Sequence, residues 1–220
     1  MTDATESADK AQATTGRTND PARTMANILA VARTEFAEKG LAGARIDEIA
    51  AATQTSKRMI YYYFQNKEGL YLAVLEAAYR EMREQEADLK LDNLPPLEAL
   101  RTLVSHTFDR QWQHEDYARL IMTENINRGQ TLARSQYIQE LNVPAISSIE
   151  KLYQRGLAEG VFRPGLDPVE IHASISALTF FNVSNQHTFG LIFKIDTAGQ
   201  DWVSRRRQGV VDMIERYVRI

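Results

Sequence analysis

The chain has 220 residues, 26 basic and 29 acidic side chains, a formal net charge of −3 and no cysteine. This length fits one large domain or two small ones. The lack of cysteine excludes disulfides, thiolate metal sites and a cysteine nucleophile, and no apolar run is long enough to span a membrane. The N-terminus lacks the apolar segment of a secretion signal, so we expect a cytoplasmic protein. Taken alone, the acidic balance argues against binding to a polyanion.

The first residues differ in composition from the rest of the chain. Residues 2–20 contain no Ile, Leu, Val, Phe, Tyr or Trp, so they cannot bury enough apolar surface to offset the entropy of ordering. We predict a disordered tail over residues 1–20. Beyond it, apolar residues recur at spacings of three and four, and no segment alternates long enough to predict a strand. The predicted fold class is therefore all-α.

Each predicted helix combines a periodic apolar stripe with a start or stop signal. In chain order, these helices cover residues 20–40, 46–52, 56–64, 66–86, 97–112, 117–125, 132–159, 167–189 and 201–220. Residues 88–96 read as a boundary between two halves. Pro144 removes a backbone hydrogen bond and is expected to kink or restart its helix. Gly160 marks the end of that helix, and Asp167 followed by Pro168 marks the start of the next.

The two short helices, joined by a short break and preceded by a longer helix, match a helix-turn-helix motif, whose second helix lies in the major groove of DNA. That second helix carries three tyrosines in succession at residues 61–63. Successive helical residues lie about 100° apart, so at least one tyrosine, and by our interpretation two, must face outward. Lys57 and Arg58 add positive charge at the end that would enter the groove. The alternative is a solvated helix with a tyrosine-rich packing face.

The run from Ala44 to Phe64, with the flanking segments 36–40 and 66–70, closely resembles the DNA-binding domain of TetR-type transcriptional regulators. The resemblance covers about residues 21–82 and spans three helices with fixed spacing. It implies an N-terminal three-helix DNA-binding domain over residues 21–82. It also implies a helical domain over residues 83–220 that dimerises through its last two helices and encloses a small-molecule pocket. Carried over position by position, it places nine residues at or near DNA: Arg45, Ser56, Lys57, Arg58, Met59, Tyr61, Tyr62, Tyr63 and Lys67.

Three positions depart from the usual family pattern. Gln54 stands where the turn usually carries glycine, so it is expected to adopt a positive φ at some energetic cost. Arg45 stands where the second helix usually starts with Ser or Thr; it cannot cap that helix but could contact a phosphate. Arg58 stands where the family often has Gly or Ala, which would add a contact to guanine. These departures would change which operator is read without changing the fold.

We therefore expect a ligand-responsive repressor that binds a pseudo-palindromic operator in double-stranded DNA as a homodimer. A small-molecule effector would release it by favouring a dimer geometry in which the recognition helices no longer match the operator. Pocket candidates are polar or bulky residues on otherwise apolar helices: His106, Trp112, Tyr117, Met122, Phe180, Phe181, Asn185 and His187. The aromatic candidates could equally belong to the hydrophobic core without contacting a ligand, and the polar run over residues 182–188 could lie at the interface between subunits. A small aromatic or carboxylated ligand would suit this mixture.

Two other classes of protein stay open. A helical enzyme is disfavoured because the four histidines form no metal-ligand motif and no nucleotide-binding glycine pattern occurs; we expect no cofactor. A helical interaction module without specific DNA binding would bind its partner independently of Lys57, Arg58 and the tyrosines. The charge distribution favours the regulator. Residues 17–70 hold eight basic and six acidic residues, so the positively charged part of this acidic chain contains the predicted DNA reader.

Overall fold

The computed structural model describes residues 20–220, so the expected tail over residues 1–19 lies outside the described residues. The helices in this part of the chain are α1 Pro21–Gly43, α2 Ile46–Ala52, α3 Lys57–Phe64, α4 Lys67–Ala87, η1 Leu91–Asn93, α5 Pro96–Gln113, α6 Glu115–Ile126, η2 Leu132–Arg134, α7 Gln136–Ala158, α8 Pro168–Ser184, α9 Gln186–Phe193 and α10 Gln200–Val218. Residues 20–220 otherwise contain only an isolated β-bridge between Phe162 and Arg219. The all-α prediction is confirmed. In the same range, none of the helices has the length and apolarity needed to cross a membrane.

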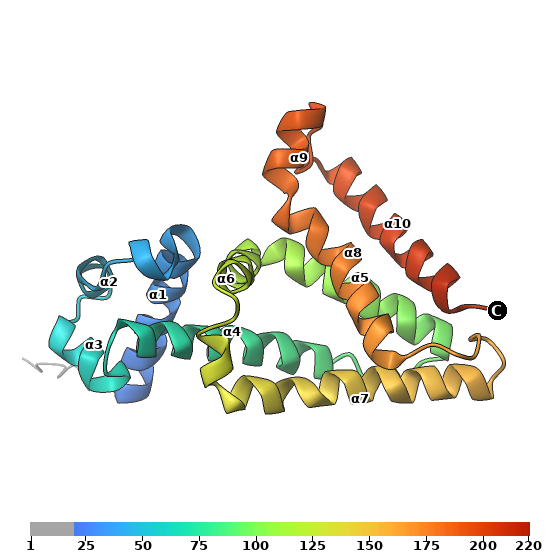
Figure 1. Cartoon of the computed structure of the whole chain (residues 1–220), viewed down its shortest axis with the longest axis horizontal. Helices are drawn as coiled ribbons and strands as arrows, with labels where there is room; N and C mark the ends of the chain where they lie inside the picture. Colours follow the sequence, from blue (N-terminus) through green and yellow to red (C-terminus); the bar gives the residue numbers. More distant parts are fainter. Residues whose placement is uncertain (1–19) are drawn as a thin grey trace, which may run out of the picture.

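The helices form a compact N-terminal group and a more open C-terminal group (Figure 1). Helices α1–α3 gather at one end of the molecule, and α4 leads away from them toward the C-terminal helices. The long helix α7 packs against α4, while α8 packs against α5, α7 and α10. Helix α9 lies at the tip of an arm formed by α8 and α10 (Figure 1). Through α4, the N-terminal helices are thus connected directly to the C-terminal body.

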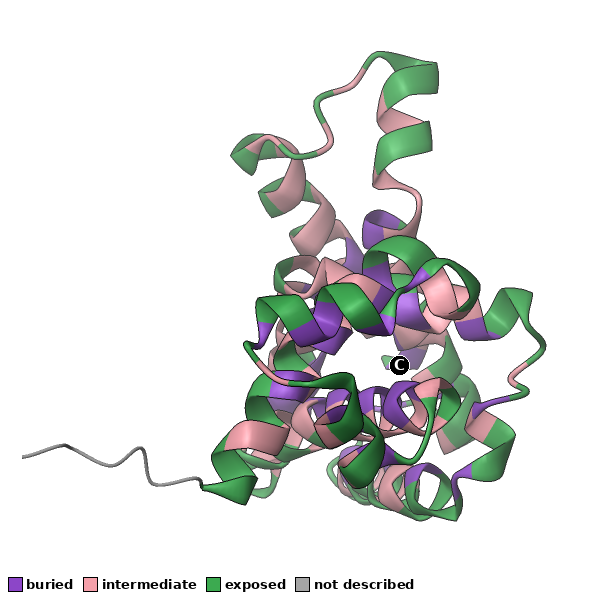
Figure 2. Cartoon of the chain, turned by 90° about the vertical axis from the view of Figure 1, so that its left-hand side faces the viewer, coloured by how far each residue is buried: buried purple, intermediate pink, exposed green. Residues whose placement is uncertain are grey.

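The buried side chains form two apolar clusters, and Figure 2 shows the buried residues in the body of the molecule rather than at the tip of the α8–α10 arm. The N-terminal cluster unites α1–α4 around fully buried residues such as Phe36, Ile60 and Tyr71, and it also includes Tyr117 and Leu120 of α6. The C-terminal cluster joins α5, α7, α8 and α10. Burying apolar side chains stabilises a fold in proportion to the area removed from water. Since these side chains of α6 are buried in the N-terminal cluster, α6 is held mainly by the N-terminal helices. The apolar packing therefore crosses the expected domain boundary at residues 82 and 83.

Side-chain caps begin helices α3 and α4 as expected. The Ser56 hydroxyl accepts a hydrogen bond from the backbone N–H of Met59 at 3.2 Å, and the Asn66 side chain accepts one from the N–H of Gly69 at 2.7 Å. Each cap satisfies a backbone donor that has no partner within its helix. Gln54, in the turn, has φ of 52°, which confirms the expected positive φ. The helix-turn-helix geometry is therefore encoded by neighbouring residues.

The structure excludes one alternative at Pro144 and contradicts one helix prediction. Helix α7 runs through Pro144, so the helix does not restart there; the alternative, a kink, stays a prediction, and α7 begins after Ser135, whose hydroxyl caps it. Pro144 is exposed, so water can reach the carbonyl group that loses its N–H partner. The single helix expected over residues 167–189 is split at Asn185, which has φ −112° and ψ 3°. Its amide donates to the Ser184 hydroxyl at 2.8 Å, the kind of local side-chain bond that competes with a helix.

Candidate DNA-binding surface and internal cavity

Helix α3 presents two of its three tyrosines to solvent. Tyr62 is 76% exposed and Tyr61 42% exposed, whereas Ile60 and Phe64 are buried. Tyr63 is half-buried, and its ring packs edge-on against that of Tyr62 with centroids 5.3 Å apart. This confirms the prediction that two tyrosines face outward. The outward rings and hydroxyl groups are free to meet a nucleic acid backbone or base edge.

The basic residues of the motif differ in how they are held. The Lys57 ammonium lies 2.5 Å from a carboxylate oxygen of Asp47 on α2. Lys67 donates a hydrogen bond to the backbone carbonyl of Ala42 at 3.2 Å. Over residues 20–220, no carboxylate lies within 4.0 Å of the Arg58 guanidinium. Arg58 therefore presents an uncompensated positive charge.

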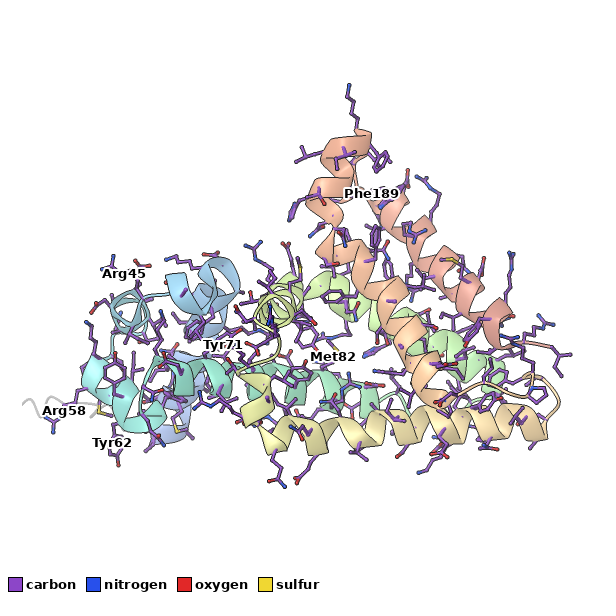
Figure 3. The ribbon with its side chains drawn as sticks, viewed as in Figure 1. Arg45, Arg58, Tyr62, Tyr71, Met82 and Phe189 are labelled. Atoms are coloured by element: carbon purple, nitrogen blue, oxygen red, sulfur yellow. The ribbon has the colours of Figure 1, made fainter. Side chains whose placement is uncertain are left out.

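The remaining predicted DNA contacts lie on or near the same end. Figure 3 shows Arg45, Arg58 and Tyr62 projecting outward from the end of the molecule that is remote from α8–α10. Arg45 is exposed and only 4.0 Å from Glu48, and Met59 is half-buried. Ser56 is exposed and caps α3 as described above. The geometry brings these residues together on two neighbouring helices; contact with DNA stays a prediction for each.

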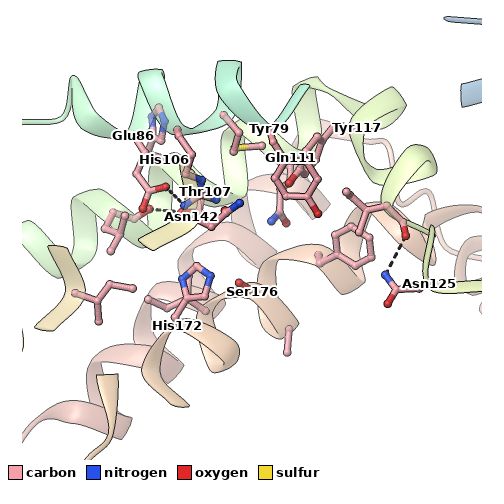
Figure 4. A pocket seen from close by; sticks show the side chains of 18 residues that line it. Tyr79, Glu86, His106, Thr107, Gln111, Tyr117, Asn125, Asn142, His172 and Ser176 are labelled. Carbon is pink, nitrogen blue, oxygen red and sulfur yellow. Dashed lines mark hydrogen bonds and ion pairs between the residues drawn. The ribbon is translucent and has the colours of Figure 1, made fainter. Parts of the chain in front are cut away.

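An internal cavity of about 390 Å³ lies between the two apolar clusters. Its walls come from α4 to α8 (Figure 4) and consist of Tyr79, Met82, Arg83, Glu86, Leu103, His106, Thr107, Gln111, Tyr117, Ile121, Asn125, Asn142, Ile149, His172, Ile175, Ser176, Ala177 and Phe180. The volume lies within the range of small-molecule sites, about 300–1,000 Å³. We call it the central cavity.

Glu86 and the two histidines lie toward one end of the central cavity, and the tyrosines lie toward the other end together with Gln111 and Asn125 (Figure 4). At the histidine end, Arg83 and Glu86 form an ion pair at 2.5 Å with both side chains 16% exposed. Burial raises the pKa of Glu86 and lowers that of His172, so burial favours the uncharged form of each side chain. Within residues 20–220, three buried polar atoms of wall residues have no hydrogen-bond partner: Arg83 Nε, His106 Nε2 and Gln111 Oε1. Buried polar groups usually have partners, so these atoms are exceptions that lie on residues of the cavity wall.

The eight predicted pocket residues fall into several places. His106, Tyr117 and Phe180 line the central cavity. Phe181 and Asn185 line a smaller cavity of about 170 Å³ beside α10, and Met122 and His187 line a groove against α1. Trp112 lies on none of these walls and stacks on Phe108 with ring centroids 6.5 Å apart.

Sequence reasoning missed several wall residues of the central cavity, of which the charged pair is the most telling. Arg83 and Glu86 are three residues apart on a helix, which is also the spacing of an ordinary solvent-exposed pair. Nothing in the local pattern distinguishes the two cases. His172 follows a capped helix start and belongs to no metal motif. These side chains are buried only because α5, α7 and α8 fold over α4.

An ionic cluster, which we call the Arg33 network, crosses the boundary between the two apolar clusters. Arg33 of α1 bonds to Glu81 of α4 at 2.6 Å and also pairs with Asp116 of α6. Glu81 additionally accepts from Arg110 of α5 at 3.2 Å. Burial acts to raise the pKa of Glu81, but the Arg33 hydrogen bond and nearby positive charges hold that pKa below its usual value. Side chains of alternating charge thus connect four helices: α1, α4, α5 and α6.

A helix-turn-helix with an outward-facing recognition helix, joined to a helical body that encloses a cavity, defines a ligand-responsive transcriptional regulator. Residues 28–74 match the family model described as bacterial regulatory proteins, tetR family, and residues 96–214 match the tetracyclin repressor-like C-terminal domain. The chain belongs to the TetR family of DNA-binding transcriptional regulators.

Several known proteins are similar over most of the chain. The HTH-type transcriptional repressor NicS of Pseudomonas putida is 34% identical over 83% of this chain and 88% of its own. The HTH-type transcriptional repressor KstR2 of Mycobacterium tuberculosis is 26% identical over 71% of this chain and 78% of its own. Its solved structure has a TM-score of 0.67, covering 93% of this chain and 98% of its own. The structure of AibR in complex with isovaleryl coenzyme A and operator DNA has a TM-score of 0.64, 21% identity, and coverage of 86% and 97%. These structural likenesses support the fold.

Proposed function

We propose that this protein represses transcription by binding a pseudo-palindromic operator as a homodimer, and that a small molecule in the central cavity releases it. The observation that carries the proposal is the position of the cavity. It lies between the apolar cluster that holds the DNA-binding helices and the cluster that holds α5, α8 and α10. A ligand there contacts both parts, so it can favour one relative position over another. The similarity to NicS, a named repressor, supports repression rather than activation of transcription.

On the DNA side, α3 would enter the major groove, with Arg58 and the exposed tyrosines reading the operator. An arginine that reaches a guanine can donate two hydrogen bonds to it, which is the commonest specific contact in the major groove. Lys57, Lys67, Arg45 and Ser56 would contact the sugar-phosphate backbone. In this proposal Met59 and Tyr63, which are half-buried, help to position α3.

On the ligand side, we place the effector among His106, Tyr117 and Phe180 in the central cavity. Gln111 and Arg83, on the same walls, would supply polar groups that orient it. The AibR structure contains both isovaleryl coenzyme A and operator DNA, which supports a site for a small molecule and a site for DNA in this fold. The residues predicted elsewhere, such as Trp112 and His187, are not needed for this site.

The dimer would form through the last helices, where large apolar side chains remain exposed: Val169, Phe181, Leu191, Ile192, Phe193 and Met213. Exposed apolar surface of this extent on α8–α10 is typical of protein–protein contact surfaces. Two-fold symmetry would place the two α3 helices on the same side of one DNA duplex, about 34–36 Å apart. Such a dimer would act in the cytoplasm, where the DNA is.

Selection from a random duplex library tests the DNA side. Wild-type protein should enrich an inverted repeat whose half-sites are one helical turn, or a multiple of it, apart. The Arg58→Ala variant should lose preference at one base position of each half-site, at a cost of about 1–3 kcal/mol. Enrichment of a single half-site, or of no sequence, would contradict the dimeric operator.

Thermal unfolding with a metabolite panel tests the ligand side. A compound that raises the unfolding temperature should also release the operator, since both effects follow from binding to the folded protein. The Phe180→Trp variant, which narrows the central cavity, should weaken both effects together. The matched Met122→Phe variant changes the groove against α1 and should leave both unchanged. An effector response that survives in the Phe180 variant but is lost in the Met122 variant would show that the effector binds in that groove instead.

A further inference from the structure

The carboxylate of Asp47 lies in the middle of the candidate DNA-binding surface. Asp47 is exposed in the first turn of α2, and its oxygen is 2.5 Å from the ammonium of Lys57, the first residue of α3. The two side chains are 58% and 50% exposed. The pair therefore bridges the two helices of the motif on its solvent side.

We propose that Asp47 is a specificity-determining residue, which neutralises Lys57 so that attachment to DNA depends on the base-reading side chains rather than on general charge. The proposal rests on the proposed function, because it requires α3 to face DNA. Lys57 can stay paired with Asp47 and make no contact with a phosphate. Alternatively, it can break the ion pair to contact a phosphate, which leaves the negative charge of Asp47 unpaired next to the DNA backbone. In both cases the pair adds no net attraction to DNA.

The other charges of the motif support this interpretation. Lys39, at the end of α1, is paired with both Glu35 and Glu48. Lys67 donates to a backbone carbonyl. Arg58, by contrast, stands one residue from Lys57 and has no carboxylate within 4.0 Å in the described part of the chain. In residues 20–220, carboxylates thus lie against Lys39 and Lys57, whereas Arg58, whose planar guanidinium suits two hydrogen bonds to guanine, has none beside it.

Removing the carboxylate should release one cation to the DNA backbone. Each phosphate contact adds about 0.9 to the slope of log K against log salt. We expect Asp47→Asn to bind a duplex of unrelated sequence with a slope steeper by about 0.9, and about eightfold more tightly at 0.1 M salt. Affinity for the operator should rise less than affinity for unrelated DNA wherever Lys57 already reaches a phosphate there. The ratio of the two affinities should fall.

Fluorescence anisotropy with labelled duplexes over a range of salt concentrations measures both quantities. Asp47→Glu keeps the charge and should restore the wild-type slope. The double variant Asp47→Asn with Lys57→Ala removes both members of the pair and should also return close to wild type. Glu84→Gln is a matched control. It removes the carboxylate from a similarly exposed ion pair, that of Arg80 and Glu84 on α4, which lies outside the helix-turn-helix. The salt dependence of DNA binding should be unchanged in this variant. Thermal unfolding should show all of these variants folded, since exposed ion pairs contribute little to stability.

The outcomes separate this inference from the proposed function. If wild type selects an operator but Asp47→Asn has the wild-type slope and affinity on unrelated DNA, Asp47 has no such role. The same conclusion follows if the gain persists without Lys57, or if Glu84→Gln produces it as well. If wild type selects no operator, the proposed function itself is wrong.

Discussion

Replacing Arg33 by glutamine would remove the cation at the centre of the Arg33 network. The guanidinium is 19% exposed and binds Glu81 at 2.6 Å and Asp116. After the substitution, Glu81 keeps its bond from Arg110 at 3.2 Å. Asp116 keeps only a backbone N–H as hydrogen-bond partner, that of Tyr117 at 2.9 Å. The variant therefore leaves one carboxylate poorly compensated.

The size of the effect follows from exposure. Glu81 and Asp116 are 38% and 35% exposed, between a surface pair worth about 0.2–1 kcal/mol and a buried pair whose disruption costs about 3–5 kcal/mol. We expect Arg33→Gln to lower the free energy of unfolding by about 1–2 kcal/mol. For a chain of this size that lowers the Tm by about 2–8 °C.

The stability lost in the Arg33→Gln variant should depend on pH in a defined direction. The pKa of Glu81 is lowered in the folded protein: burial acts to raise it, and the Arg33 hydrogen bond and nearby positive charges outweigh burial. A carboxyl group of this kind stabilises the fold above its unfolded pKa, and the stabilisation is lost as the pH falls through its folded pKa. The deficit of the variant should be constant above about pH 5.5 and shrink below about pH 4.

Urea unfolding of wild type and Arg33→Gln at several pH values measures the deficit. Arg101→Gln is the matched control, because Arg101 makes two bonds to Glu215, at 2.7 and 2.9 Å, but is 51% exposed. It should cost less than about 1 kcal/mol. A wild-type unfolding midpoint for Arg33→Gln at pH 7, or a deficit that stays the same at about pH 3, would refute this reasoning.

Three further substitutions have defined outcomes in thermal unfolding. Gly156→Ala should destabilise the protein by more than about 2 kcal/mol, because its Cβ would lie 2.0 Å from the buried ring of Phe162; an unchanged Tm would contradict this packing. Gln54→Gly should stabilise it by up to about 1 kcal/mol by relieving a φ of 52°; a lower Tm would contradict this. Pro144→Ala should raise the Tm by restoring an N–H donor at this exposed position of α7. A lower Tm would show that the proline does not destabilise the helix.

The sequence sufficed for the helix-turn-helix because its determinants are local. Ser56 and Asn66 cap helices through bonds to residues three positions away, and the outward tyrosines follow from helical geometry alone. Asn185 shows the limit of the same reasoning. The helix break there depends on side-chain bonds within a polar run that carries neither proline nor glycine, so periodicity predicted a continuous helix.

The cavity could not be predicted from local patterns because its walls come from helices that are distant in sequence. Three of the eight predicted pocket residues line it, and these three share no spacing that separates them from the other five. Whether a polar side chain on an amphipathic helix faces a cavity or solvent is decided by the partner helix. Arg83 and His172 are nearly ninety residues apart in sequence and meet across this cavity.

The connection between α5 and α6 links the cavity to the DNA-binding helices. Gln111 and Tyr117 line the central cavity. Their chain neighbours Arg110 and Asp116 belong to the Arg33 network, which includes α1. A backbone shift at this connection cannot move one set of side chains without moving the other. Because a ligand acts only through its different affinities for two states, a ligand that contacts Gln111 and Tyr117 is placed to distinguish two positions of α6 relative to α1, and hence two positions of the recognition helix.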